Sequence, residues 1–418
     1  MTNKLRNRLI ALTCLIIFLG LGATLFLNST GSKPFAVILF IGDGITPGTL
    51  ASARLFSGGG EAKLDMENLP NVALCRNAAN DFSVPESASA STALAAGKRV
   101  NRASLCIDPS GAKLSSLLEE AASCGRSTGL ITTGEIAGVT AAAFYAKTLV
   151  SDKRNEVISQ YCSHAPFDFV AGGGAQDFTQ GSQEGDSPLL KQLADNGISV
   201  LRTVADIEKQ PFWKRTPILG LLAPGPLIDP VQDEVAPQPP SLSDLVRVAI
   251  SHLQGNNRGY LLVVDDPMIA AAAATNDGET VLKRLIAFDE AVATARRYAG
   301  ENALLVVTGR ENIGGLQLNG YPFLRDKGVA LLALNAEGYP SLCWSTGPGH
   351  SNEDNGSASR SKKLTQTAGI LAQPSAHRLS SGVGVAGDMV TLGAGHGSEK
   401  LHGFLDLTEV HDVIRDQL

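Results

Sequence analysis

The sequence has no long run of lysine or arginine, and its 41 Asp and Glu residues outnumber its 35 Lys and Arg residues. A protein whose main partner is nucleic acid needs a concentrated basic face to bind the phosphate backbone. With a formal net charge of −6 at pH 7, the chain is not expected to bind nucleic acid as its main partner. An acidic balance leaves small phosphate esters open as ligands.

Cysteine is also scarce, and the sequence has no Cys-x-x-Cys pair and no Cys/His cluster at zinc-ligand spacing. A structural zinc site is therefore not expected. One of the six cysteines, Cys14, lies in an apolar N-terminal stretch. The other five are an odd number, so at most two disulfides can form within one chain.

What the sequence does have is length and apolar content. Its 418 residues are 44% hydrophobic and 18% charged, which is enough to bury a large core and excludes disorder as the main state. We expect one large globular domain with insertions. The 44 glycines indicate many tight turns and close approaches of the backbone.

The N-terminus carries the first strong local pattern. Lys4, Arg6 and Arg8 precede Leu9–Leu27, an uncharged apolar stretch that is long enough to cross a hydrocarbon layer of roughly 30 Å. A buried core helix is the alternative, but the basic flank favours a targeting segment. We predict that residues 1–32 form a cytoplasmic tip and a membrane anchor or signal segment, and that residues 33–418 form a periplasmic or extracellular domain. No small-x-small cleavage site ends the stretch, which favours an uncleaved anchor.

The rest of the chain alternates short apolar runs with helical periodicity, as in Leu114–Ala122 and Val281–Ala299. This alternation predicts an α/β fold, a three-layer α/β/α sandwich around a mostly parallel sheet. Loop excursions are expected near residues 219–240 and 345–361, which are rich in Pro and in Gly, Ser and Asn respectively. The predicted strands are Phe35–Ile41, Gly129–Thr132, Phe167–Ala171, Tyr260–Val264, Ala303–Val307 and Val329–Leu334.

Polar residues follow three of these strands directly. Asp43 comes after the first strand, Asp265 after the fourth, and Arg310 and Glu311 after the fifth. Ligands collect at the carboxyl ends of parallel strands, so these side chains are candidates for one site. Ser87 starts a small-residue helix, where a serine is either a cap or a nucleophile facing a phosphate.

Taken in order, segments of the chain from Phe35 to Leu418 resemble the alkaline phosphatase family. Asp43 stands at the family's first metal aspartate, Ser87 at its phosphorylated serine and Thr140 at a metal-binding threonine. The segments that carry the resemblance are Val37–Gly44, Ala51–Arg54, Glu86–Ala88, Thr92–Ala93, Thr128–Thr133, Ala142–Ala146, Asp168–Gly174, Thr275–Asp277, Phe288–Val292 and Gly403–Val410.

The resemblance implies that a phosphate monoester is split by in-line attack of Ser87 between two zinc ions, with a magnesium ion alongside. It also implies a cationic clamp on the phosphate oxygens. Lys153 and Arg154 both fall near the family's arginine, and only an arginine offers a bidentate fork. Homodimerisation is common in the family and is a further expectation.

The sequence departs from the family at most of the zinc ligands. Ala270 and Ala274 stand where an aspartate and a histidine are expected. An acidic and an imidazole ligand are replaced by Arg310 and Glu311, and a C-terminal histidine falls at about Gly384. Catalytic zinc normally needs three protein ligands, so bound zinc is doubtful.

A magnesium-like site is better preserved, because Asp43, Thr140 and Asp265 still offer oxygen ligands. Asp265 is one methylene shorter than the glutamate expected there, and the partner ligand before Thr140 is replaced by Gly138. Mg²⁺ is therefore a possible cofactor, with Glu311 as a further weak metal ligand. His350 and His377 are alternative ligands if their loops shift, and each is otherwise a solvated loop histidine.

The sequence is compatible with three functions. The first is a degenerate alkaline-phosphatase-like protein that binds a phosphorylated or sulfated ligand without efficient two-metal hydrolysis, with Arg310 and Arg154 supplying positive charge. The second is an active phosphate monoester hydrolase in which Ser87 attacks, Arg310 stabilises charge and Glu311 is the base. The third is a membrane-anchored scaffold without a small ligand.

Overall fold

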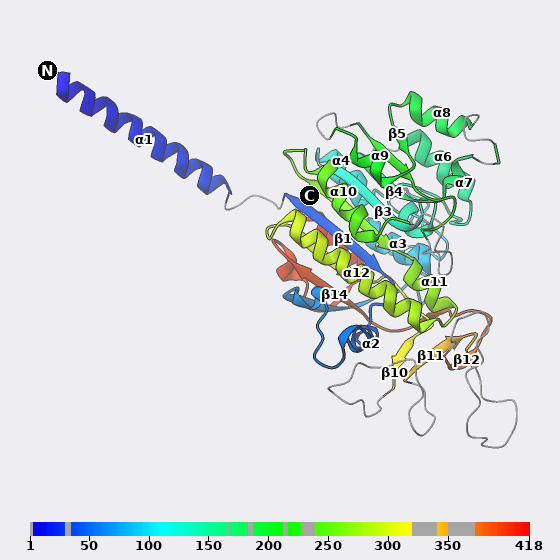
Figure 1. Ribbon diagram of the computed structural model, residues 1–418. Helices are drawn as coiled ribbons and strands as arrows, with labels where there is room; N and C mark the ends of the chain where they lie inside the picture. The colour runs from blue at the N-terminus through cyan, green and yellow to red at the C-terminus, as the bar shows by residue number, and fades with distance from the viewer. Residues whose placement is uncertain are drawn as a thin grey trace, which may run out of the picture. The chain divides into compact units, whose positions relative to one another are not determined.

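The computed structural model describes residues 3–29, 35–164, 167–179, 181–182, 187–211, 216–227, 239–319, 341–349 and 373–418. The chain forms two compact units, residues 1–34 and residues 35–418. Figure 1 shows the order of the elements along the chain.

The first unit contains one helix, α1 (Asn3–Ser29), which covers the apolar stretch Leu9–Leu27. Among the residues that the structure describes, no helix combines the length and the apolar character needed to cross a membrane. The membrane anchor expected at the N-terminus therefore finds no support in the structure.

In the described part of the chain, the second unit is built on a ten-stranded sheet whose middle strands run parallel, with the antiparallel strand β14 near one edge. This confirms the predicted α/β class. The strands in spatial order are β15 (Gly403–Asp406), β2 (Asn71–Arg76), β14 (Met389–Ala394), β8 (Leu304–Thr308), β1 (Ala36–Gly42), β7 (Tyr260–Asp266), β3 (Ser127–Glu135), β4 (Phe169–Gly173), β6 (Ile218–Leu221) and β5 (Ser199–Leu201).

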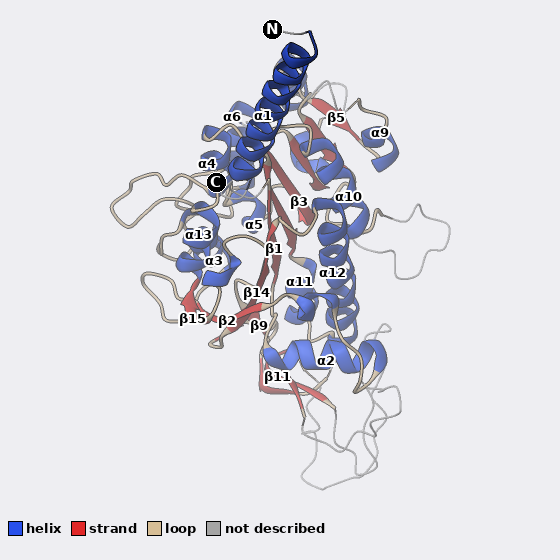
Figure 2. Ribbon diagram, turned by 90° about the vertical axis from the view of Figure 1, so that its left-hand side faces the viewer, coloured by secondary structure: helices blue, strands red, loops and turns tan. Residues whose placement is uncertain are grey.

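Strand β1 shows why the unit has three layers. All of its residues are buried, and alternate side chains enter two different cores: Ile38 and Phe40 pack in one, Leu39 and Ile41 in the other. Side chains alternate between the faces of a strand, so helices must cover both faces of the sheet. Figure 2 shows helices on both sides of the central strands.

The helices divide between the two cores by the side chains they bury. The first core is covered by α2 (Pro47–Gly58), α9 (Val204–Glu208), α10 (Leu242–Leu253), α11 (Met268–Ala274) and α12 (Gly278–Ala299). The second is covered by α3 (Ser87–Ala96), α4 (Leu117–Ser123), α5 (Val139–Ala142), α6 (Arg154–His164), α7 (Ala175–Thr179), α8 (Pro188–Asp195) and α13 (Leu407–Arg415).

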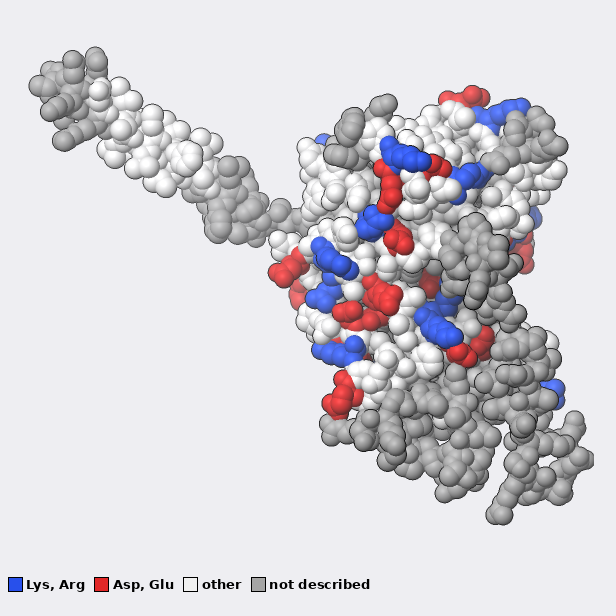
Figure 3. Space-filling view, in the orientation of Figure 1, with Lys and Arg blue, Asp and Glu red and all other residues white. Residues whose placement is uncertain are grey.

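Short strands outside the main sheet form two small sheets. One contains β10 (Leu316–Leu318), β11 (Leu342–Gly347) and β12 (Ser375–Arg378), and the other pairs β9 (Asn312–Ile313) with β13 (Gly384–Val385). On the face shown in Figure 3, the basic and acidic side chains of the described residues are interspersed.

Five of the six predicted strands correspond to β1, β3, β4, β7 and β8, and the sixth, Val329–Leu334, lies outside the described residues. The loop expected from residue 219 begins instead in strand β6, because its first residues are apolar and buried beside β4. The excursion expected from residue 345 likewise begins in β11. Residues 228–238 and 350–372 lie outside the described residues. All six cysteines are free.

Candidate functional site

The carboxyl ends of the neighbouring strands β8, β1 and β7 bring the predicted polar residues together. Asp43 follows β1, Asp265 is the penultimate residue of β7, and Arg310 and Glu311 follow β8 after a glycine. That glycine, Gly309, is needed because a Cβ atom there would lie 2.9 Å from the carbonyl oxygen of Gly42. The loop after β8 can therefore lie against the end of β1.

Arg310 is the centre of the cluster. Its Nη2 lies 2.6 Å from Oδ2 of Asp43, its Nη1 lies 2.7 Å from Oε1 of Glu311, and Nη1 also donates a hydrogen bond to the backbone carbonyl of Ser87. The side chains of all three ionisable residues are at most 4% exposed. A buried guanidinium between two carboxylates occupies the place where the family resemblance puts a metal ligand.

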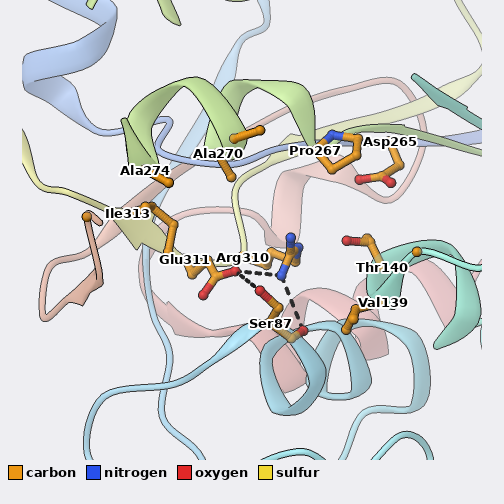
Figure 4. Close-up of a pocket in the computed structure, with 13 residues that line it drawn as sticks. Ser87, Val139, Thr140, Asp265, Pro267, Ala270, Ala274, Arg310, Glu311 and Ile313 are labelled. Atoms are coloured by element: carbon orange, nitrogen blue, oxygen red, sulfur yellow. Dashed lines mark hydrogen bonds and ion pairs between the residues drawn. The ribbon is translucent and has the colours of Figure 1, made fainter. Parts of the chain in front are cut away.

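Ser87 is the first residue of α3, and its hydroxyl donates a short hydrogen bond to Oε1 of Glu311. The helix begins here because the carboxylate of Glu86 caps it, accepting hydrogen bonds from the backbone N–H groups of Ala88 and Ser89 at 2.8 Å each. Figure 4 shows Ser87, Glu311 and Arg310 directed toward one another. A serine hydroxyl hydrogen-bonded to a carboxylate has the geometry of a nucleophile beside a base.

Asp265 and Thr140 line the same cavity as Ser87 (Figure 4). Oδ2 of Asp265 accepts a hydrogen bond of 2.9 Å from the hydroxyl of Thr132, and Oδ1 of Asp265 is buried without a hydrogen-bond partner. Thr132 was not singled out in the sequence. The signal that identifies it is its position opposite Asp265 in the parallel pair of β3 and β7.

Burial dominates the electrostatics of the cluster. It raises the pKa of Asp43 to about 7 although Arg310 opposes the shift, and it raises the pKa of Asp265 to about 8. Burial alone would lower the pKa of Arg310, but the carboxyl groups of Asp43, Glu311 and Asp265 raise it above its ordinary value. Arg310 is therefore a permanent cation.

The cavity has a volume of about 330 Å³. Its polar side is formed by Ser87, Thr140, Asp265, Arg310 and Glu311. Much of the remaining lining is apolar. Val139, Pro267, Ala271, Ile313 and Gly382 were not predicted as part of a site, whereas Gly138, Ala270 and Ala274 were predicted as positions of replaced ligands. Ala270 and Ala274, predicted as lost ligands, lie on α11 beside the cavity (Figure 4).

The two predicted phosphate-clamp residues, Arg154 at the first position of α6 and Lys153 just before that helix, are not among the residues that line the cavity. Arg154 places its Nη2 at 2.7 Å from Oε2 of Glu135 and at 2.5 Å from Oδ2 of Asp177. Lys153 is exposed and pairs with Glu156. Arg310 is thus the one predicted cation that reaches the described part of the cavity.

Two of the remaining predicted positions lie on short strands outside the main sheet. His377 lies exposed on β12, and His350 lies outside the described residues. Gly384 lies on β13 and pairs with Ile313, but it has no side chain to offer.

The donor set does not fit a pair of zinc ions. Within the described ranges, no group of three or more His, Cys, Asp or Glu side chains is placed to hold a metal ion. Two of the carboxylates near the cavity, those of Asp43 and Glu311, are already paired with Arg310. A fixed positive charge at that position repels a divalent cation.

The sequence of this chain is similar to those of known alkaline phosphatases. A family model described as alkaline phosphatase matches residues 35–418. Alkaline phosphatase 4 of Bacillus subtilis is 28% identical over 295 residues, which cover 68% of this chain and 62% of that protein. The tissue-nonspecific alkaline phosphatase of Homo sapiens is 26% identical over 373 residues, covering 75% of this chain and 70% of that protein.

Solved structures show the same fold. Alkaline phosphatase of Thermus thermophilus superimposes with a TM-score of 0.72 at 20% identity, covering 93% of this chain and 92% of that chain. The enzyme of the Antarctic bacterium TAB5 gives a TM-score of 0.70 at 21% identity, covering 92% and 98%. A His 135 Asp mutant of that enzyme has Mg bound in a site termed M3.

Proposed function

Because this chain belongs to the alkaline phosphatase family, we propose that it is a degenerate member, which binds a phosphorylated or sulfated ligand without efficient two-metal hydrolysis. The observation that carries the proposal is the pairing of Arg310 with both Asp43 and Glu311. Members of this family depend on metal ions, and here a guanidinium takes up carboxylates that would otherwise be free to bind them.

Residues of this chain would hold the ligand as follows. The cavity offers a guanidinium on one side, and the hydroxyls of Ser87 and Thr140 nearby. A guanidinium and hydroxyl groups are donors for the oxygens of a phosphate or sulfate group. Ala270 and Ala274 of α11 take the place of side chains that would bind metal, and their methyl groups offer no hydrogen bonds to a ligand or to water.

The oxygen ligands that suit Mg²⁺ are partly kept, in Asp265 and Thr140. Mg²⁺ is often bound through one or two carboxylates while it keeps several waters. Asp265 has an unpartnered oxygen, and Thr140 lines the same cavity. Bound there, the ion would add positive charge beside the ligand.

The proposal is tested by measuring binding and turnover on the same purified protein. Calorimetry with phenyl sulfate and phenyl phosphate reports binding, and release of phenol from phenyl phosphate reports turnover. The proposal expects saturable binding of at least one of the two esters and no turnover that depends on added zinc. Zinc-dependent turnover would overturn it, and so would the absence of binding by both esters.

A second candidate is an active phosphate monoester hydrolase with Ser87 as nucleophile, and the hydrogen bond from Ser87 to Glu311 favours it. Glu311 would accept the hydroxyl proton as Oγ attacks phosphorus and the ester P–O bond breaks, and the alcohol would leave with that proton while Arg310 stabilises the developing charge. Water would then cleave the phosphoserine, releasing inorganic phosphate and restoring the Ser87 hydroxyl. This candidate expects zinc-independent turnover that disappears in both Ser87→Ala and Glu311→Gln. Activity that persists in Ser87→Ala would contradict it.

We also propose that the large unit functions outside the cytoplasm. The support is the pattern of Lys4, Arg6 and Arg8 before an uncharged stretch. A β-lactamase fused after the complete chain tests this directly. Ampicillin resistance is expected, and sensitivity of cells that make the full-length fusion would contradict export.

A further inference from the structure

We infer that the cavity beside Ser87 selects singly charged oxyacid esters with a compact apolar group over doubly charged phosphate monoesters. Sulfate monoesters and phosphodiesters share this chemistry. The inference rests on the proposed ligand-binding function and specifies the class of ligand. It stands on three features: the charge balance of the cluster, the unpartnered Nε of Arg310, and the apolar lining of the cavity.

The charge balance is the first feature. One guanidinium, that of Arg310, faces three carboxyl groups, those of Asp43, Glu311 and Asp265. All four residues are at most 4% exposed, so solvent screens their charges poorly. The carboxylates of Asp43 and Glu311 pair with Arg310 and offset its charge, so no cation that lines the described cavity is left to balance the second negative charge of a dianion. A dianion is therefore opposed more strongly than a monoanion.

Other cations of the chain do not change this balance. Arg154 was predicted as a phosphate-binding cation, but Glu135 and Asp177 both bind its guanidinium. Lys153 extends into solvent, with its side chain 60% exposed. Among the described residues that line the cavity, Arg310 carries the one positive charge.

The unpartnered Nε of Arg310 is the second feature. Nε of Arg310 is buried and has no hydrogen-bond partner, although both terminal nitrogens of the guanidinium are paired. A buried N–H without an acceptor costs free energy until a ligand or a water satisfies it. Three of the five N–H groups of Arg310 face Asp43, Glu311 and the carbonyl of Ser87, so Nε and Nη2 each retain one N–H group that can donate to an anionic oxygen.

The apolar lining is the third feature. Ala270, Ala271 and Ala274 of α11 share the cavity with Val139, Pro267 and Ile313. Methyl and methylene groups offer no hydrogen bonds to a charged head group, but they stabilise an apolar substituent by removing it from water. A volume of about 330 Å³ is at the lower end of the range for small-molecule sites and fits a compact ester.

The test compares phenyl sulfate with phenyl phosphate at pH 8, where the first is a monoanion and the second a dianion with the same ring. Calorimetric titration of the full chain, with a chelator present so that divalent cations add no charge, gives both dissociation constants. We expect phenyl sulfate to bind about tenfold or more tightly than phenyl phosphate. Methyl sulfate is expected to bind more weakly than phenyl sulfate, because it leaves the apolar lining uncovered.

The results of these titrations distinguish failure of the inference from failure of the proposed binding function. Phenyl phosphate that binds as tightly as phenyl sulfate, or more tightly, overturns the inference and leaves the proposed binding function intact. Methyl sulfate that binds as tightly as phenyl sulfate overturns the role of the apolar lining. If neither phenyl ester binds, the proposed function fails and the inference fails with it.

A matched pair of variants identifies the source of the selectivity. Glu311→Gln removes one negative charge beside Arg310 while keeping the shape of the side chain. It is expected to narrow the ratio of the two dissociation constants by about tenfold. Glu279→Gln removes a charge of the same kind from an ion pair with Lys283 at the surface and is expected to leave the ratio unchanged. Equal ratios in both variants would contradict the assignment to Glu311.

Discussion

Arg310 supplies the positive charge at the site and pairs with the carboxylates around it. It is buried, it pairs with Asp43 and Glu311, and it donates to the backbone of Ser87. A buried charge that loses its partner is destabilising, whereas a group of buried charges replaced together by neutral residues is often tolerated. The free energies of unfolding of a single variant and of a variant with the whole group replaced therefore report the role of Arg310.

We predict that Arg310→Met lowers the free energy of unfolding by about 3 kcal/mol or more, because it leaves two buried carboxyl groups without a cation. Urea unfolding followed by circular dichroism measures the change. In the triple variant Arg310→Met, Asp43→Asn, Glu311→Gln, most of the loss is expected to be recovered. A triple variant no more stable than the single one would show that the ion pairs are not the cause.

Asp265 predicts a dependence of stability on pH. Burial raises its pKa from 3.8 to about 8, so between these values the folded protein holds a proton that the unfolded chain has lost. Unfolding then releases a proton, and the free energy of unfolding falls as the pH rises from about 4 to 8. The contribution is fully present below about pH 4.

The variant Asp265→Asn tests this dependence, because asparagine does not ionise and still accepts the hydrogen bond from Thr132. Its stability relative to the natural chain is expected to rise by about 1 kcal/mol or more between pH 5 and pH 9. Urea unfolding in a chelator at several pH values measures the difference. Parallel stability curves for the two proteins would contradict the raised pKa.

At the scale of secondary-structure elements, the start of α3 positions Ser87. The carboxylate of Glu86 accepts three backbone hydrogen bonds, from Ala88 and Ser89 at 2.8 Å and from Ala103 at 2.9 Å. One side chain thus fixes both the first turn of the helix and the loop at Ala103. The position of the serine depends on this cap.

We predict that Glu86→Ala lowers the free energy of unfolding by about 1–2 kcal/mol. Glu86→Gln keeps a carbonyl oxygen as acceptor and is expected to lose less. Chemical denaturation of the three proteins measures the order. An alanine variant as stable as the natural chain would show that water replaces the cap without cost.

The order of strands and helices along the sequence predicts some contacts in the site and leaves others unpredicted. Asp43, Asp265 and Glu311 follow buried apolar runs, and the carboxyl ends of parallel strands meet at one edge, so the pattern alone predicts that they lie close together. Arg154 lies near the family position of a phosphate-binding arginine. Its partner Asp177 comes from a different helix, and a contact of that kind leaves no periodic signal in a single sequence.

At the scale of the whole molecule, the fold follows from patterns of apolar residues. Strands such as Tyr260–Asp266 are apolar for most of their length because helices cover both faces, and this pattern predicts the layered α/β class. The small sheet that contains β11 and β12 was not predicted. Its strands are short and only partly buried, so they lack the alternation that identifies a strand.

The family fold has been kept, and we propose that the two-metal chemistry has been lost. Metal content and phosphatase rate, measured together on the purified chain after dialysis against excess zinc and magnesium, test this claim most directly. The account predicts no bound zinc and no zinc-dependent turnover of a generic phosphate monoester. About two bound zinc ions per chain together with turnover would contradict it, because residues such as Glu311 or His377 would then have rebuilt the metal site.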